Sequence, residues 1–261
     1  MQMAHVAFET GASTHVGKVR QRNEDSYLIH PEVGVWAVAD GMGGHEDGHF
    51  ASRAVVEALS SIGIQNTASD LLKVCESRIF EANLRVIDTS RQRNGVVIGT
   101  TVTVLLASDG YFASLWCGDS RIYLVRNDEI TQLSRDHTEI QELLINGRIT
   151  AEEAANWSGS NAITRAIGVA EVPELEFTSG PLNSGDIFVI CSDGLTRHVA
   201  DREILECVSV NTSQQACDSL IGKTLERGAL DNVTIIVVRY LPRTDRNTTP
   251  QTYSAHPEVQ T

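Results

Sequence analysis

Four aspartates combine residue type and position in a way that suits metal chemistry: Asp40, Asp119, Asp193 and Asp231. Each is next to glycine or asparagine and lies at one end of an apolar run, as in VWAVADGMGG and FVICSDGLT. Such positions place carboxylates at strand ends, where backbone carbonyls and water can help them hold hard divalent cations. The pattern indicates a metal-dependent hydrolase.

The types of ligand narrow the choice of metal. Carboxylates that gather at one sheet edge repel one another, and their pKa values rise unless divalent cations neutralise them. The chain has five cysteines but no C-x-x-C pair and no H-E-x-x-H, so the spacings typical of zinc sites do not occur. Mg²⁺ or Mn²⁺ is expected instead, because carboxylate, carbonyl and water oxygens suit these ions.

The elements that must position the aspartates are predicted from hydrophobic periodicity. Runs rich in β-branched and aromatic residues predict strands at 33–39, 97–107, 111–117, 121–126, 186–191 and 232–240. Apolar residues at helical spacing predict helices at 47–62, 69–90, 201–209 and 213–227. The order of these elements indicates a chain of the α+β class.

Two connections place the aspartates relative to the strands. The short link CGDS at 117–120 predicts a hairpin with Asp119 at its tip. Asp193 ends one predicted strand and Asp231 opens another, so antiparallel pairing would bring both to a common edge. We expect an α-β-β-α sandwich of two antiparallel sheets flanked by helices. One domain is expected over 1–242, with a flap at about 138–162, and a disordered polar tail over 243–261.

Bulk properties exclude several functional classes. The 261 residues carry a formal net charge of −13, which argues against binding to a phosphate backbone of nucleic acid. Five scattered cysteines are typical of reduced thiols rather than of a disulfide scaffold. The N-terminus shows no apolar segment of the secretory type, and no uncharged run approaches the roughly 20 residues that span a bilayer. We therefore expect a cytoplasmic protein without membrane contact.

Eight blocks in order resemble one protein family: GKVRQRNEDSY, ADGMGGHEDG, GTTVTVLL, CGDSRIYLV, RDHT, TRAIG, CSDGLT and DNVTIIVV. The chain resembles the metal-dependent (PPM, type 2C) Ser/Thr protein phosphatases in their compact bacterial form, over nearly all of residues 15–240. Taken singly, each Asp-Gly pair is more typical of a turn. The resemblance implies hydrolysis of phosphoserine and phosphothreonine by direct attack of a metal-activated water. It also implies a cognate Ser/Thr kinase and its phosphorylated substrates as partners.

The resemblance also implies roles for individual residues. Asp40 would bridge two Mn²⁺ or Mg²⁺ ions, the carbonyl of Gly41 would contact the second ion, and Asp193 with Asp231 would hold the first. Glu24 and Asp25 would act as outer ligands through water. Arg20 would bind the substrate phosphate, a planar bidentate contact that lysine makes less well. Asp119, together with Asp193, would hold a third and weaker ion.

The general acid is the point at which the sequence departs from the family. Many relatives carry histidine two positions after the bridging aspartate, but this chain has Met42 there and histidines only at 45 and 49. A water bound at the third metal site and His45 are both candidates for the proton donor. His137, in RDHT, is expected to be a hydrogen-bonded structural histidine.

Three other interpretations compete with this one. CSDGLTR has the C-x5-R spacing of cysteine phosphatases, although Asp193 in that loop would repel a phosphate dianion. IGKT at 221–224 resembles the end of a P-loop, but position 217 is Cys where the loop needs glycine. A noncatalytic module of the same fold that binds phosphoproteins is the remaining alternative.

Overall fold

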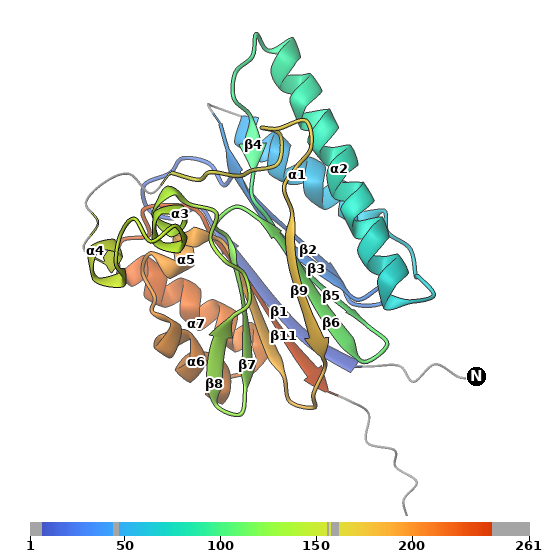
Figure 1. The fold of residues 1–261 in the computed structure, drawn as a ribbon. Coiled ribbons are helices and arrows are strands. Elements are labelled where there is room, and N and C mark those ends of the chain that lie inside the picture. Colours follow the sequence, from blue (N-terminus) through green and yellow to red (C-terminus); the bar gives the residue numbers. More distant parts are fainter. Residues whose placement is uncertain (1–6, 44–46, 156, 158–161, 242–261) are drawn as a thin grey trace, which may run out of the picture.

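The computed structural model describes residues 7–43, 47–155, 157 and 162–241. Two antiparallel sheets stack face to face, and helices cover the outer face of each sheet (Figure 1). The predicted α-β-β-α sandwich is therefore confirmed. Among the described residues, no helix combines the length and the hydropathy needed to cross a bilayer.

The first sheet has five strands in the order β1-β11-β10-β7-β8. These strands are β1 (Ala7–His15), β7 (Arg121–Arg126), β8 (Glu129–Gln132), β10 (Ile187–Cys191) and β11 (Val233–Leu241). All neighbours pair antiparallel. Cys191 lies opposite Ile235, so the end of β10 and the start of β11 lie at the same edge. The expected common edge for Asp193 and Asp231 is thus present.

The second sheet has six strands, with β2-β3-β5-β6-β9 along its main path and β4 paired to β3. Its strands are β2 (Asp25–His30), β3 (Val35–Met42), β4 (Gly99–Thr100), β5 (Val102–Ser108), β6 (Tyr111–Cys117) and β9 (Glu176–Pro181). Asp25 lies directly opposite Asp40 across β2 and β3. This register brings two of the predicted ligands together at the end of the sheet.

Helices cover the two sheets on opposite sides of the molecule (Figure 1). Residues of α1 (Asp47–Ser60) and α2 (Ala68–Gln92) pack on the six-stranded sheet. Those of α5 (Asp193–Thr196), α6 (Asp201–Val210) and α7 (Ser213–Glu226) pack on the five-stranded sheet. Thr67 and Thr212 cap α2 and α7, because each hydroxyl accepts a hydrogen bond from the backbone three residues on.

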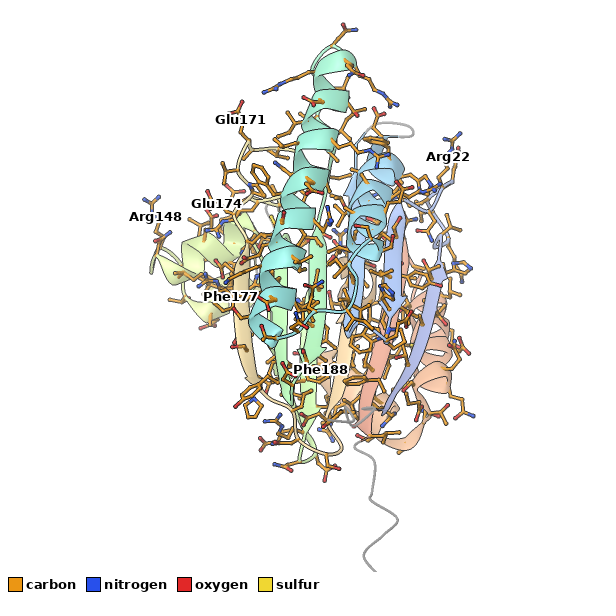
Figure 2. All side chains as sticks on the ribbon, turned by 90° about the vertical axis from the view of Figure 1, so that its right-hand side faces the viewer. Arg22, Arg148, Glu171, Glu174, Phe177 and Phe188 are labelled. Atoms are coloured by element: carbon orange, nitrogen blue, oxygen red, sulfur yellow. The ribbon has the colours of Figure 1, made fainter. Side chains whose placement is uncertain are left out.

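The core between the sheets is built from alternate residues of their inner faces. Trp36 and Phe112 come from one sheet, and Phe188, labelled in Figure 2, comes from the other. The rings of Phe112 and Phe188 lie 5.1 Å apart between centroids. Burial of each such side chain contributes about 1.5–3 kcal/mol. The packing of the two sheets therefore fixes the edge at which the acidic residues lie.

The expected hairpin through CGDS is wrong, because β6 belongs to the six-stranded sheet and β7 to the five-stranded one. The segment 118–120 carries the chain from one sheet to the other, and Gly118 makes the change of direction with φ at +113°. The real hairpin in this region joins β5 to β6 through Asp109 and Gly110, both at positive φ. Asp119 consequently lies at the crossing between the sheets rather than at a hairpin tip.

The segment expected to form a flap contains two short helices, α3 (Glu139–Ile145) and α4 (Ala151–Ala155). They lie beside the sandwich (Figure 1). The motion of this segment remains a prediction. The polar tail expected at 243–261 lies outside the described residues, as does His45.

Candidate active site

A pocket of about 220 Å³ opens at the sheet edge where the predicted site residues meet. Of the eight residues predicted for the site, six line this pocket: Arg20, Glu24, Asp40, Gly41, Asp193 and Asp231. The other two, Asp25 and Asp119, lie close enough for their charges to act on Asp40. The structure therefore brings the whole predicted set together.

Backbone contacts fix Asp40 at the end of β3. Thr101 accepts a hydrogen bond from the amide of Asp40 through its hydroxyl at 3.0 Å, and its own amide donates to the Asp40 carbonyl at 2.8 Å. Gly41 follows, and its amide donates to the carbonyl of Glu24 at 3.2 Å. A Cβ at Gly41 would lie 2.1 Å from the carbonyl oxygen of Gly48, so only glycine fits this close approach.

Asp25 ties the two sheets together beneath the pocket. Its Oδ2 accepts hydrogen bonds from the hydroxyls of Ser192, at 2.9 Å, and Thr234, at 2.7 Å, both of which belong to the opposite side of the sandwich. Burial raises the pKa of Asp25 to about 6, although these two hydrogen bonds oppose the shift. Asp25 is buried, and its second carboxylate oxygen has no hydrogen-bond partner.

Asp119 is held at the crossing by His137. The amide of Gly118 donates to Nδ1 of His137 at 3.1 Å, and the amide of His137 donates to the Gly118 carbonyl at 2.9 Å. His137 is buried, which fits the structural role expected for it. Burial, followed by the charge of Asp193, raises the pKa of Asp119 to about 7.

Asn232 clamps the segment that carries Arg20 and Glu24, a role that the sequence analysis missed. Its Nδ2 donates to the carbonyls of Val16 and Arg22, each at 2.9 Å, and its Oδ1 accepts from the amide of Glu24 at 2.8 Å. The side chain is buried. Its place directly after Asp231 in the DN pair was the only signal in the sequence.

Arg197 is the second functional residue that the sequence analysis missed. It lines the pocket, forms a hydrogen-bonded ion pair with Asp193 and lies 4.0 Å from Asp231. Arg20 donates to Oδ2 of Asp231 at 2.9 Å. Because its side chain is 54% exposed, Arg20 remains accessible to a ligand in the pocket. The two arginines therefore place positive charge next to Asp193 and Asp231.

The electrostatics of the carboxylates favour a bound cation. Burial, and then the charge of Asp25, raise the pKa of Asp40 well above its usual value, and burial also raises the pKa of Asp193. Four buried carboxylate oxygens at the site have no hydrogen-bond partner: Glu24 Oε1, Asp25 Oδ1, Asp119 Oδ1 and Asp193 Oδ1. Unpaired oxygens of this type are the ligands that Mg²⁺ and Mn²⁺ prefer, so the donor set fits these ions.

The spacing of the acidic side chains determines whether several of them could bind one ion directly. Within the described part of the chain, no three His, Cys, Asp or Glu side chains converge closely enough to ligate one ion directly. Arg20 and Arg197 contact Asp231 and Asp193 in this arrangement. Both arginines contact Oδ2 atoms, whereas Oδ1 of Asp193 has no hydrogen-bond partner.

The two competing sequence motifs do not form reactive sites. Cys191 is fully buried in β10, and burial raises the pKa of its thiol to about 12, so the thiolate is disfavoured. The IGKT segment lies inside α7, where its backbone amides take part in the helix. All five cysteines are buried and free, as expected.

Comparison with known proteins identifies the family. The family profile described as protein phosphatase 2C matches residues 13–226. The serine/threonine protein phosphatase PstP of Mycobacterium tuberculosis is 36% identical over 224 residues, which cover 85% of this chain and 43% of PstP. The serine/threonine phosphatase stp of Listeria innocua is 32% identical over 245 residues, covering 90% of this chain and 95% of its own length.

A solved structure agrees with these relatives. The catalytic domain of PstP, in complex with two manganese ions, superposes with a TM-score of 0.81 at 33% identity and covers 90% of this chain and 99% of that one. The chain belongs to the protein phosphatase 2C family, which confirms the resemblance drawn from the eight blocks. It spans less than half the length of the Mycobacterium tuberculosis relative.

Proposed function

We propose that the protein is a metal-dependent phosphatase that hydrolyses phosphoserine and phosphothreonine in proteins. The observation that carries the proposal is the convergence of Arg20 with Glu24, Asp40, Asp193 and Asp231 in one pocket. The relatives named serine/threonine protein phosphatase support the same enzyme class and imply phosphorylated proteins as substrates. The kinase that phosphorylates those substrates is the natural partner.

The ligand set follows from the donor atoms of the pocket. Asp40, Asp193, Asp231 and the carbonyl of Gly41 would hold two divalent cations, while Glu24 and Asp25 would act through water. Asp119 would hold a third ion together with Asp193. When bound, the ions would lower the pKa of a water molecule and offset the charge of the phosphoryl group.

The protein side chains would orient the substrate. Arg20 is accessible, and its planar guanidinium can donate two parallel hydrogen bonds to phosphate oxygens. Arg197 lines the same pocket, so it would also stabilise negative charge on the phosphoryl group. No nucleophilic side chain is required, and the phosphoryl group would pass to water in one step.

Phosphate release from a phosphothreonine peptide tests the proposal. We expect turnover in Mn²⁺, loss of turnover in EDTA and loss in Asp193→Asn. Asp88→Asn, which changes an exposed aspartate on α2, is the matched control and should keep full activity. Cys191→Ser should also remain nearly fully active. Activity that persists in both EDTA and Asp193→Asn would contradict the proposal.

The noncatalytic phosphoprotein-binding module remains the second candidate. It predicts that the carboxylates bind metal while no phosphopeptide is hydrolysed. The presence of Arg20 in one pocket with four of the six predicted carboxylates, Glu24, Asp40, Asp193 and Asp231, favours the enzyme.

A further inference from the structure

A second pocket, of about 580 Å³, lies beside the active site and concentrates positive charge. Its lining includes four arginines, one glutamate and an aromatic ring: Arg22, Arg53, Arg85, Arg93, Glu57 and Phe50. Arg93 forms an ion pair with Asp47, so the positive charge that remains for a ligand comes from Arg53 and Arg85, in a chain whose net charge is −13. Figure 2 shows Arg22 at the periphery of the molecule, beside α1.

Two of the arginines share one carboxylate. Arg53 on α1 and Arg85 on α2 donate to different oxygens of Glu57, each at 3.1 Å. Each guanidinium has five N–H donors, so most of them remain available for a ligand, and one positive charge is left over. The Cζ atom of Arg85 lies over the ring of Phe50, 5.5 Å from its centroid, a cation–π contact. About half of each arginine side chain is exposed.

One segment, residues 20–24, contributes side chains to both the basic pocket and the active-site pocket. Arg20 and Glu24 line the active-site pocket, whereas Arg22 and Asn23, between them in the sequence, line the basic pocket. The Cα atoms of Arg20 and Arg22 lie at most about 7 Å apart, because two residues of chain cannot span more. A bound polypeptide would therefore reach both pockets within a few residues.

From these observations we infer that the basic pocket binds a second anionic side chain of the substrate polypeptide, a phosphorylated or acidic residue two to four positions from the phosphoresidue. The inference rests on the proposed function and adds a preference for substrates with an acidic or multiply phosphorylated sequence. An extended peptide advances about 3.3 Å per residue, so two of its residues cover the span between the Cα atoms of Arg20 and Arg22. Arginine suits this task, since its planar fork binds carboxylate and phosphate in bidentate fashion.

Two phosphothreonine peptides that differ only at the flanking positions test the inference. One carries glutamate or phosphoserine two to four residues from the phosphothreonine, and the other carries glutamine or serine there. We expect the wild-type protein to prefer the acidic peptide in kcat/KM. In the double variant Arg53→Gln and Arg85→Gln, this preference should fall at least about fivefold, the size expected for the loss of two half-exposed charge contacts. Turnover of the neutral peptide should not change.

Arg202→Gln is the matched control, because Arg202 on α6 also pairs with a glutamate four residues on, at 3.0 Å. It should leave the preference intact. Glu57→Gln removes the carboxylate that competes for the two arginines, so it should strengthen the preference for the acidic peptide. Because this variant keeps both arginines, it also tests the inference if the double variant fails to fold. The preference should also weaken as salt rises.

Several results would overturn the inference: equal kcat/KM values for the two peptides in the wild type, an unchanged preference in the double variant, or an equal loss in Arg202→Gln. Calorimetric affinity for the acidic peptide in EDTA gives a readout that does not need turnover, and it should fall in the double variant. Absence of turnover on both peptides would instead contradict the proposed function, and the calorimetric result would still decide the inference.

Discussion

Asn232 has no role in the proposed reaction, but its hydrogen bonds position a segment of the site. Its three hydrogen bonds hold the carbonyls of Val16 and Arg22 and the amide of Glu24. The segment between them carries Arg20, whose guanidinium faces the pocket. The position of Arg20 therefore depends on Asn232, which holds its segment, as well as on the hydrogen bond that Arg20 donates to Asp231.

Replacing Asn232 by alanine should weaken both stability and catalysis. The three backbone groups lose buried partners, at a cost of about 1–3 kcal/mol in the free energy of unfolding. KM for a phosphopeptide should rise because Arg20 is no longer held in place. Asn211→Ala removes a side chain that caps α6 far from the pocket, so it should leave KM unchanged. Urea denaturation and steady-state kinetics measure the two effects, and an unchanged KM in Asn232→Ala would contradict the role.

The sequence predicted the carboxylates better than the groups that support them. Asp40, Asp193 and Asp231 stood out because each combines a charge with an adjacent glycine or asparagine at the end of an apolar run. Arg197 and Asn232 carry no such signal, since a single arginine or asparagine is ordinary at a surface. Their roles arise from contacts that only the folded chain creates.

At the scale of elements, the prediction found the central strands and missed the edges. The four strands absent from the prediction are β1, β2, β8 and β9, and they form the four outer edges of the two sheets. Central strands such as β10 are buried throughout and read as continuous apolar runs, whereas β2 and β9 alternate mainly between partly buried and exposed residues. A short alternating strand with polar residues resembles a loop in the sequence alone.

Gly118, at the crossing between the sheets, has no room for a larger side chain, and this can be tested by substitution. A Cβ there would lie 2.6 Å from Cγ2 and 2.7 Å from Cβ of Thr101, the residue that holds Asp40. Gly118→Ala should lower the free energy of unfolding by more than about 2 kcal/mol, since strain at positive φ and a collision combine. Gly110→Ala is the matched control, because Gly110 also has positive φ but open space around it.

Denaturant midpoints compare the two glycine variants. Gly118→Ala should also weaken Mn²⁺ binding, since Thr101 must move. If the two substitutions lower the free energy of unfolding equally, the close approach between Gly118 and Thr101 contributes nothing to the effect of Gly118→Ala.

An ion pair joins the ends of α6 and α7 and predicts a dependence on pH. Arg227 donates to both oxygens of Glu203, at 2.6 and 2.7 Å. These bonds lower the pKa of Glu203 to about 2 from an ordinary value of 4.5. A carboxyl with a lowered pKa in the folded state stabilises the protein above its unfolded pKa, and this contribution is lost as the pH falls toward 2.

Glu203→Gln should therefore lower the melting temperature at pH 7 by no more than about 3 °C, the size expected for an exposed pair. The difference from wild type should shrink as the pH falls from 4.5 toward 2. Glu206→Gln, on the same helix, serves as the control. Thermal unfolding followed by circular dichroism measures the difference in melting temperature. A difference that grows as the pH falls would contradict the prediction.

The site belongs to the molecule as a whole, because no single sheet contains it. Asp25 and Asp40 come from the six-stranded sheet, and Asp193 and Asp231 flank strands of the five-stranded sheet. Asp119 lies on the link between the sheets. The carboxylates therefore meet only when the sheets are packed, and the free energy of sheet packing opposes their mutual repulsion.

Calorimetric titration of metal-free protein with Mn²⁺ tests the central claim most directly. We expect at least two ions per chain, loss of this binding in Asp193→Asn, and loss of only a weaker ion in Asp119→Ala. Asp119→Ala should also lower phosphopeptide turnover. Binding of fewer than two ions by the wild-type protein, or loss of all metal in Asp119→Ala, would contradict the account.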